Sequence, residues 1–159
     1  MTGDELKKLI GEAEQDPKRL AAAVSGLPEA VLLKKPGPGK WSIHEIVGHL
    51  ADAEIIFGHR IRQALADKEP IFAPIDQDLW TEHLGYTEAA IPELIAQFGV
   101  NRFHTLRLLK RVQPEVMTKT GYHPGHKEHV SLEEMVRYWV GHGPGHLAQI
   151  ERIKKDASI

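Results

Sequence analysis

Three capping-box motifs constrain the fold of this chain more than any other feature of its sequence. In such a box, a hydroxyl accepts a hydrogen bond from the amide three residues later, and a glutamate there accepts one from the amide of the cap residue. Apolar residues at helical spacing follow each box, so each motif predicts where a helix begins. The boxes are Thr2-x-x-Glu5, Ser42-x-x-Glu45 and Ser131-x-x-Glu134.

Apolar residues at helical spacing mark four long segments, over residues 6–24, 43–64, 91–109 and 132–153. Pro92 falls in the first turn of the third segment, where a missing amide costs little. No segment alternates convincingly between apolar and polar residues as a half-buried strand would. We therefore expect an all-α protein, a four-helix bundle, in which residues 1–159 form one domain.

The connections between these segments are rich in glycine and proline. They include residues 35–39, 70–85 and 121–125. The link between the second and third helices is the longest. Loops of that length usually carry function or cover a site.

The overall charge and composition exclude several classes of protein. The net charge is −2 at pH 7, which offers no basic field for nucleic acid or anionic membranes. No apolar run approaches the length of a membrane span, and the first residues lack the features of a signal peptide. We therefore expect a cytoplasmic protein that binds neither nucleic acid nor membranes. The chain has no cysteine, so any metal ligands would be His, Asp or Glu.

Histidine is unusually frequent, with ten in the chain, and three of them form a pattern typical of metal sites. His142 and His146 are four residues apart, which places them on one helix face about 6 Å apart. His49 lies at the edge of the apolar stripe of the second helix. A single buried histidine is more often satisfied by a hydrogen bond, but two in one bundle are better satisfied by a shared cation. Together the three predict a divalent-metal site with one coordination position open.

The sequence Gly143-Pro144-Gly145 separates the last two predicted ligands. Pro144 removes an amide hydrogen bond and crowds the carbonyl of Val140. A kink there would rotate His142 toward the site, whereas a break in the helix would destroy the four-residue geometry. The sequence leaves both outcomes open.

Three further residues are candidates for the cleft or for the groups behind the ligands. Asp52 lies one helical turn after the first predicted ligand, where it either supports that ligand or remains a surface carboxylate. Arg102 lies on the apolar stripe of the third helix and needs a partner, because a buried charge is costly. Arg60 and Arg62 are instead expected to be solvated. His123 belongs to a histidine-rich loop with His126 and His129. We expect a solvated loop in which His123 lines the cleft, and an independent second metal site is the less favoured alternative.

Two stretches of the sequence form a recognisable pair. Residues 40–54 are KWSIHEIVGHLADAE, and residues 142–150 are HGPGHLAQI. The Trp-Ser…His-Leu opening and the His-x-x-x-His-x-x-Gln-Ile ending together resemble the DinB-like superfamily, which includes the YfiT-like candidate metal-dependent hydrolases. The resemblance extends over about residues 20–153. The Gly-Pro-Gly insert is a departure from the family pattern.

This resemblance implies a four-helix bundle of up-down-down-up topology, a homodimer, and a divalent metal, zinc or nickel, bound by His49, His142 and His146. It also implies a small-molecule substrate. Characterised relatives include S-transferases and isomerases that use low-molecular-weight thiols such as bacillithiol or mycothiol, so a thiol cosubstrate is expected as well.

The expected function is that of a metal-dependent enzyme of the thiol S-transferase or hydrolase type. Three neutral imidazoles would bind the ion, and its open position would acidify a thiol or a water molecule. The alternative is a non-catalytic metal-binding or stress-response protein. In such a protein a structural metal would have four protein ligands instead of three.

Overall fold

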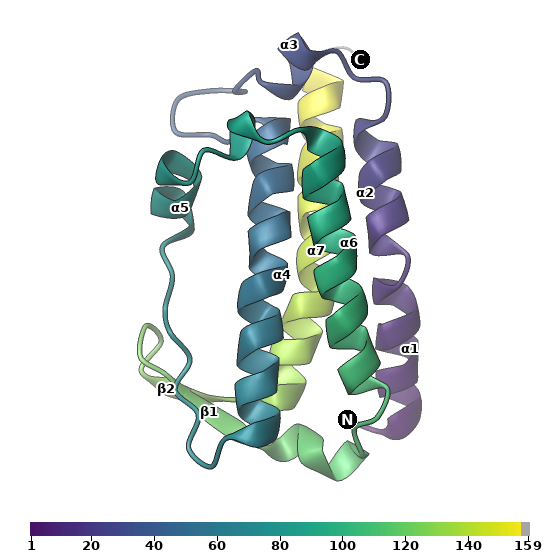
Figure 1. Cartoon of the computed structure of the whole chain (residues 1–159), viewed down its shortest axis with the longest axis vertical. Coiled ribbons are helices and arrows are strands. Elements are labelled where there is room, and N and C mark those ends of the chain that lie inside the picture. The colour runs from purple at the N-terminus through teal and green to yellow at the C-terminus, as the bar shows by residue number, and fades with distance from the viewer. Residues whose placement is uncertain (157–159) are drawn as a thin grey trace.

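The computed structural model describes residues 1–156 of the chain, and most of them are helical. Long helices run along one axis (Figure 1): α1 (Gly3–Ala13) continued by α2 (Asp16–Val24), then α4 (Ile43–Ala66), α6 (Ile91–Leu109) and α7 (Leu132–Asp156). The shorter helices are α3 (Glu29–Leu32), α5 (Gln77–His83) and the 3₁₀ helices η1 (Tyr86–Glu88) and η2 (Pro114–Thr118). Two strands, β1 (Thr120–His123) and β2 (Glu128–Ser131), precede α7.

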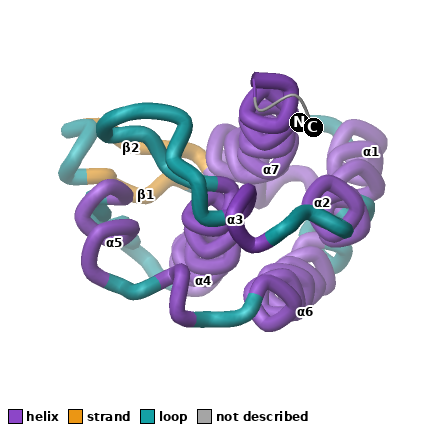
Figure 2. The backbone as a smooth tube through the Cα atoms, turned by 90° about the horizontal axis from the view of Figure 1, so that it is seen from above, coloured by secondary structure: helices purple, strands orange, loops and turns teal. Residues whose placement is uncertain are grey.

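The long helices form a four-helix bundle with the up-down-down-up topology expected from the family resemblance. In Figure 1, α1 and α2 run upward, α4 and α6 both run downward, and α7 runs upward again. Both α4 and α2 pack against α6 and against α7 (Figure 2). Because α4 and α6 are parallel neighbours, residues 67–90 must return the chain along the length of the bundle. The predicted fold class is therefore confirmed.

The three predicted capping boxes are all formed. At the start of α4, the Ser42 amide donates to Glu45 Oε2 over 2.7 Å, and the Glu45 amide donates to Ser42 Oγ over 3.2 Å. The equivalent pairs are present at Thr2 and at Ser131. The helix starts predicted from these motifs are therefore confirmed.

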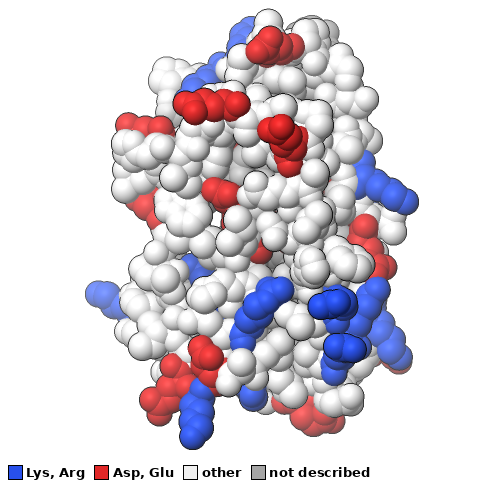
Figure 3. All heavy atoms as spheres, in the orientation of Figure 1, with Lys and Arg blue, Asp and Glu red and all other residues white. Residues whose placement is uncertain are grey.

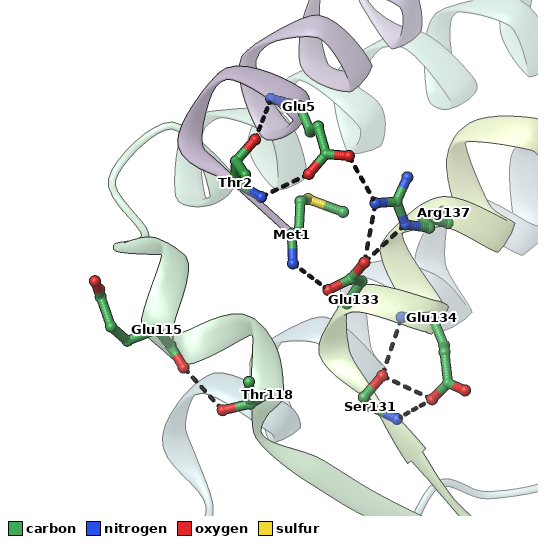
Figure 4. A network of polar contacts seen from close by, with 9 residues as sticks. All are labelled: Met1, Thr2, Glu5, Glu115, Thr118, Ser131, Glu133, Glu134 and Arg137. Atoms are coloured by element: carbon green, nitrogen blue, oxygen red, sulfur yellow. Dashed lines mark hydrogen bonds and ion pairs between the residues drawn. The ribbon is translucent and has the colours of Figure 1, made fainter.

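Ion pairs tie the first turn of α1 to the first turn of α7 (Figure 4). The amino group of Met1 pairs with Glu133, and Arg137 contacts Glu133 at 2.9 Å and Glu5 at 3.6 Å. Both helices begin at the same end of the bundle, so the positive ends of their dipoles are close together. The acidic residues in both first turns offset that unfavourable arrangement.

The first predicted helix is two helices, and that part of the prediction was wrong. A turn at Glu14 and Gln15 separates α1 from α2. Pro17 explains the interruption, because its ring would clash with the carbonyl of Ala13 in a continuous helix and it has no amide to donate. Pro17 is instead accommodated in the first turn of α2.

Residues 120–131 form a β-hairpin, whose strands are too short to be identified from the sequence pattern. Tyr122 pairs with His129, and His123 pairs with Glu128, in an antiparallel register. A segment of the long link joins β1 from the other side, where the Phe72 amide donates to the Tyr122 carbonyl over 2.8 Å. This hairpin and α5 lie on the side of α4 that faces away from α6 (Figure 2).

The apolar core is divided along the bundle axis into two clusters. One cluster contains residues of α1, the C-terminal half of α4 and the first half of α7, including Trp139. The other contains residues of α2, the N-terminal half of α4 and Ile150 of α7. The buried polar residues His49, Glu54 and Arg102 lie in the middle parts of their helices, between these clusters.

Charged side chains on the face shown in Figure 3 carry both signs and leave much of the surface uncharged. Basic side chains gather over the lower part of that face, where α6 ends with Arg107 in its last turn. Glu93 lies in the first turn of the same helix, so these charges complement the helix dipole. None of the described helices is long and apolar enough to cross a membrane.

Helix α7 continues through Pro144 without interruption, so the alternative of a broken helix was wrong. The proline still removes one amide donor inside the helix, which costs roughly 3 kcal/mol.

Pro144→Ala is therefore expected to raise the free energy of unfolding by up to about 3 kcal/mol, as measured by urea denaturation of the metal-free protein. Gly145→Ala is the matched control, because a Cβ there meets no atom within 4 Å and its gain should be about 1 kcal/mol or less. A Pro144→Ala gain no larger than the control's would contradict this expectation.

Candidate metal centre

The bundle brings three histidines from two helices into one group. His49 extends from α4, and His142 and His146 extend from α7. The Nε2 atom of His142 lies 3.2 Å from Nε2 of His49 and 3.3 Å from Nε2 of His146. A metal ion could be held where at least three His, Asp or Glu donor atoms lie within 4.8 Å of one another. Among residues 1–156, these three histidines meet that condition.

The spacing of these nitrogen atoms suits a tetrahedral cation. Imidazole nitrogens bind zinc at about 2.0–2.1 Å, so two ligands of one tetrahedral ion lie about 3.3 Å apart. The two Nε2–Nε2 distances at His142 are within about 0.2 Å of that value. The spacing of His142 from each of the other two histidines therefore suits two ligands of one shared cation.

The hydrogen-bond partner of His146 determines which of its nitrogens carries the proton. Its Nδ1 lies 2.9 Å from the amide oxygen of Gln149, an atom that can only accept. Nδ1 therefore carries the proton, and Nε2 presents a lone pair to His142. If Nε2 of His142 carries a proton, it can donate a hydrogen bond with good geometry to only one of the two neighbouring Nε2 atoms. A cation, in contrast, interacts favourably with all three nitrogens.

Burial keeps the three imidazoles neutral, as metal ligation requires. Burial, with the nearby His146, lowers the pKa of His49 to about 4. Burial, reinforced by the other two histidines and Arg102, lowers the pKa of His142 to about 3. Burial also lowers the pKa of His146, although the hydrogen bond to Gln149 acts in the opposite direction.

These pKa values predict how the stability of the metal-free protein depends on pH. The unfolded chain binds protons on histidine near pH 6.5, whereas folded His49 binds one only near pH 4. The free energy of unfolding should therefore fall as the pH is lowered from about 6.5 to 4, by about 3 kcal/mol for His49 alone. Urea denaturation across this range measures the effect. His49→Gln should lose part of the slope, and equal slopes in the two proteins would contradict a buried neutral imidazole.

Aromatic rings surround the histidine group. Trp41 stacks near His146 at a centroid distance of 6.2 Å and lies 4.7 Å from His49. On another side, Phe57 lies 5.6 Å and Tyr138 lies 6.0 Å from the ring of His142. The segment KWSIHEIVGHLADAE, which carries the family resemblance, thus contains both the predicted ligand His49 and Trp41, whose ring covers one side of the site.

The histidine group borders a cleft of about 700 Å³. His49 and His142 line one part of the cleft, which is formed by α4, α7, the hairpin and the segment that follows α4. Apolar side chains make much of its wall, and this volume is in the range of small-molecule sites. The apolar lining residues are Ala53, Ile56, Phe57, Phe72, Pro74, Ile75, Val130 and Met135.

The other residues singled out from the sequence lie in three different places. Asp52 accepts a hydrogen bond from Gln97 of α6 over 3.1 Å. His123, His126 and His129 all line the cleft; His123 is buried in β1, and the other two are exposed. The histidine-rich loop contributes no second group of three donors within residues 1–156.

Arg102 is buried in the bundle with two carboxylates, as its position on the apolar stripe required. It pairs with Asp16 of α2, and its Nη2 lies 2.6 Å from Glu54 Oε1. Trp139 also donates to Glu54 Oε1 over 2.9 Å. This ion-pair group lies directly behind α7, where a Cβ on Gly143 would be only 3.1 Å from the Asp16 carboxylate. Arg102 therefore affects His142 through its charge rather than by lining the cleft.

Sequence reasoning assigned Arg60 to solvent, and that interpretation was wrong. Arg60 is half-buried in the cleft wall, where its Nη2 donates to the Ala73 carbonyl over 2.6 Å. It follows His49 by eleven residues, or three helical turns, and therefore lies on the same face of α4. That spacing was the available signal, but the chain segment that buries Arg60 was not predictable from it.

Comparison with known proteins relates the chain to one family over most of its length. The profile of the DinB superfamily matches residues 12–150. The protein YfiT of Bacillus subtilis, named as a candidate metal-dependent hydrolase, is 26% identical over 148 residues, which cover 93% of this chain and 83% of YfiT. A candidate metal-dependent hydrolase of Bacillus licheniformis is 28% identical over 156 residues, covering 95% of this chain and 86% of that protein.

The fold is also that of a solved relative. The structure of Bacillus subtilis YfiT, described as having an unusual four-helix bundle topology, matches with a TM-score of 0.93 at 24% identity, covering 99% of this chain and 90% of that one. Metal dependence is implied by the names of the relatives and by the histidine group. The chain belongs to the DinB superfamily, with the YfiT-like candidate metal-dependent hydrolases as its relatives.

Proposed function

We propose that this protein is a metal-dependent enzyme that binds zinc or nickel through His49, His142 and His146 and acts on a small molecule as a thiol S-transferase or a hydrolase. The observation that carries the proposal is the convergence of three histidine side chains, one buried and two half-buried, beside a largely apolar cleft of about 700 Å³. The names of the relatives support the hydrolase class. The family resemblance supports the use of a low-molecular-weight thiol.

Different residues of the site would bind the cation, orient its ligands and contact the substrate. The neutral imidazoles bind the cation, and Gln149 orients His146 through Nδ1. A cation held by these imidazoles would supply Lewis acidity that lowers the pKa of a bound thiol or water molecule. Phe57, which is buried beside His142, and the more exposed Tyr138 would contact the apolar part of a substrate next to the histidine group.

A catalytic metal is favoured over a purely structural one by the number of donors. Within the described residues 1–156, the group contains three histidines and no fourth protein ligand. Structural zinc sites usually have four protein ligands, whereas catalytic sites have three and an exchangeable position. The non-catalytic alternative therefore requires a ligand that this group does not contain.

Metal-loaded protein tests the proposal in two steps. X-ray absorption spectroscopy of the zinc form should show three imidazole ligands and one further, exchangeable ligand that is not an imidazole. Thiol transfer to 1-chloro-2,4-dinitrobenzene with cysteine, and hydrolysis of p-nitrophenyl acetate, should then be faster for the metal-loaded than for the metal-free protein. Whichever reaction shows the difference assigns the class. Four protein ligands, or no difference in both reactions, would overturn an enzymatic role.

A further inference from the structure

The cleft contains a positive charge that the proposed metal chemistry does not use. Arg60 lies three helical turns after His49, so the two residues are about 16 Å apart along α4. Ala53, Ile56 and Phe57 occupy the same face between them and line the cleft. The cleft therefore has a histidine end, an apolar middle and an arginine end.

The guanidinium of Arg60 is only partly satisfied by the protein. Its Nη2 donates to the carbonyl of Ala73, but its Nε is buried with no hydrogen-bond partner. Within residues 1–156, no carboxylate lies within ion-pair distance of Arg60. Burial lowers the pKa of Arg60, which reflects the cost of holding this charge without a counterion.

Two glutamates also border the cleft, and neither neutralises Arg60. Glu134 accepts from the amide of Ser131 over 2.8 Å in the capping box of α7. Glu128 is exposed on the hairpin, opposite His123 in the strand register. Both are therefore engaged or solvated elsewhere, and the arginine end retains its positive charge.

We propose that the substrate of this cleft is an amphipathic organic anion, whose carboxylate pairs with Arg60 while its apolar part lies on Ala53, Ile56 and Phe57. This inference rests on the proposed function, because it names the substrate class of the same site. A carboxylate accepts two parallel hydrogen bonds from a guanidinium and supplies the missing counterion. The reacting group at the other end of the molecule then lies beside His49 and His142.

Octanoate and octanamide are the probes, because they share the apolar chain and differ in charge. Both are titrated calorimetrically into metal-free protein, so that no carboxylate can bind to a metal ion. Octanoate should bind at least about tenfold more tightly than octanamide. Equal affinities, or no binding of either probe, would overturn the inference without any variant.

Variants then assign the preference to one residue. Arg60→Gln should reduce octanoate affinity to that of octanamide and leave octanamide affinity unchanged, whereas Arg60→Lys should retain part of the preference. Arg62→Gln is the matched control, because Arg62 is exposed, donates to the Gly58 carbonyl and does not line the cleft. A preference that survives in Arg60→Gln, or is lost equally in Arg62→Gln, would place the anion elsewhere and overturn the assignment.

Metal content, measured in parallel, separates this inference from the proposed function. Wild-type protein that prefers octanoate but binds no zinc would overturn the metal-dependent function and support the anion site. Protein that binds zinc with three imidazoles but shows no preference for octanoate would overturn the anion site alone. Thermal melts of the Arg60 variants establish that they are folded, and Arg60→Lys provides the test if Arg60→Gln is not.

Discussion

His142→Ala is expected to reduce the affinity for zinc by about two orders of magnitude or more. Loss of a group that only supports a ligand costs about 10–100-fold, and removal of the ligand itself should cost at least as much. His142 is the central member of the group, because its Nε2 lies within 3.3 Å of both other Nε2 atoms. Without it, only the two imidazoles of His49 and His146 remain as ligands.

Competition titrations with a zinc chelator at pH 7.5 measure this affinity on protein freed of any histidine tag. His104→Ala is the matched control, because His104 is an exposed histidine on α6 that lies against Phe103. Its affinity should equal that of wild type. His146→Ala should also weaken binding, but Gln149 then loses its partner as well, so His142→Ala is the cleaner substitution. Equal zinc affinity in wild type and His142→Ala would contradict the proposal that these three histidines form a metal site.

The fold was predictable because its signals are local and repeated. A capping box is completed within four residues, and a helical stripe repeats over many turns, so α4, α6 and α7 were identified from the sequence. The hairpin was missed because its four-residue strands are too short to show a convincing alternation. The turn after α1 was missed because the apolar stripe continues across it, and only Pro17 marks the interruption.

The three histidines were predictable for the same reason, and their surroundings were not. Four-residue spacing places His142 and His146 on one face regardless of the rest of the chain. The environment of Arg60, in contrast, depends on the segment near Phe72, which is held by a backbone hydrogen bond to Tyr122 fifty residues later in the sequence. Contacts of that kind follow from tertiary packing, so the sequence offered a candidate ligand set without the shape of its cleft.

Arg102→Met is expected to lower the free energy of unfolding by about 3–5 kcal/mol, the largest stability effect that the described residues predict. The side chains of Arg102, Asp16 and Glu54 are each at most 2% exposed. A methionine fills much of the same space but leaves the buried Glu54 without a cation and the buried Asp16 with only the half-exposed Arg19. The pKa values of both carboxyls are already raised, chiefly by burial, although Arg102 acts to lower them.

Arg19→Met is the matched control, because Arg19 also contacts Asp16, at 3.3 Å, but its side chain is half-exposed. The free energy of unfolding of Arg19→Met should be lower than that of wild type by about 1 kcal/mol or less, as for other exposed ion pairs. Urea denaturation at pH 7 compares the two variants, and similar losses would contradict a special role for the buried arginine.

The pH dependence of the Arg102→Met effect separates lost charge pairing from lost packing. Without the guanidinium, the pKa values of Asp16 and Glu54 should rise further in the folded variant, because burial is then opposed only by weaker hydrogen bonds and, at Asp16, by the half-exposed Arg19. The folded variant then binds more protons than the unfolded chain as the pH falls from 7 toward 4, so acid should recover part of its lost stability. A packing defect would instead give the same loss at every pH. Because Arg102 also helps to lower the pKa of His142, its removal should in addition make that imidazole easier to protonate. The buried ion pairs thus connect the stability of the bundle to the neutral state of its central histidine.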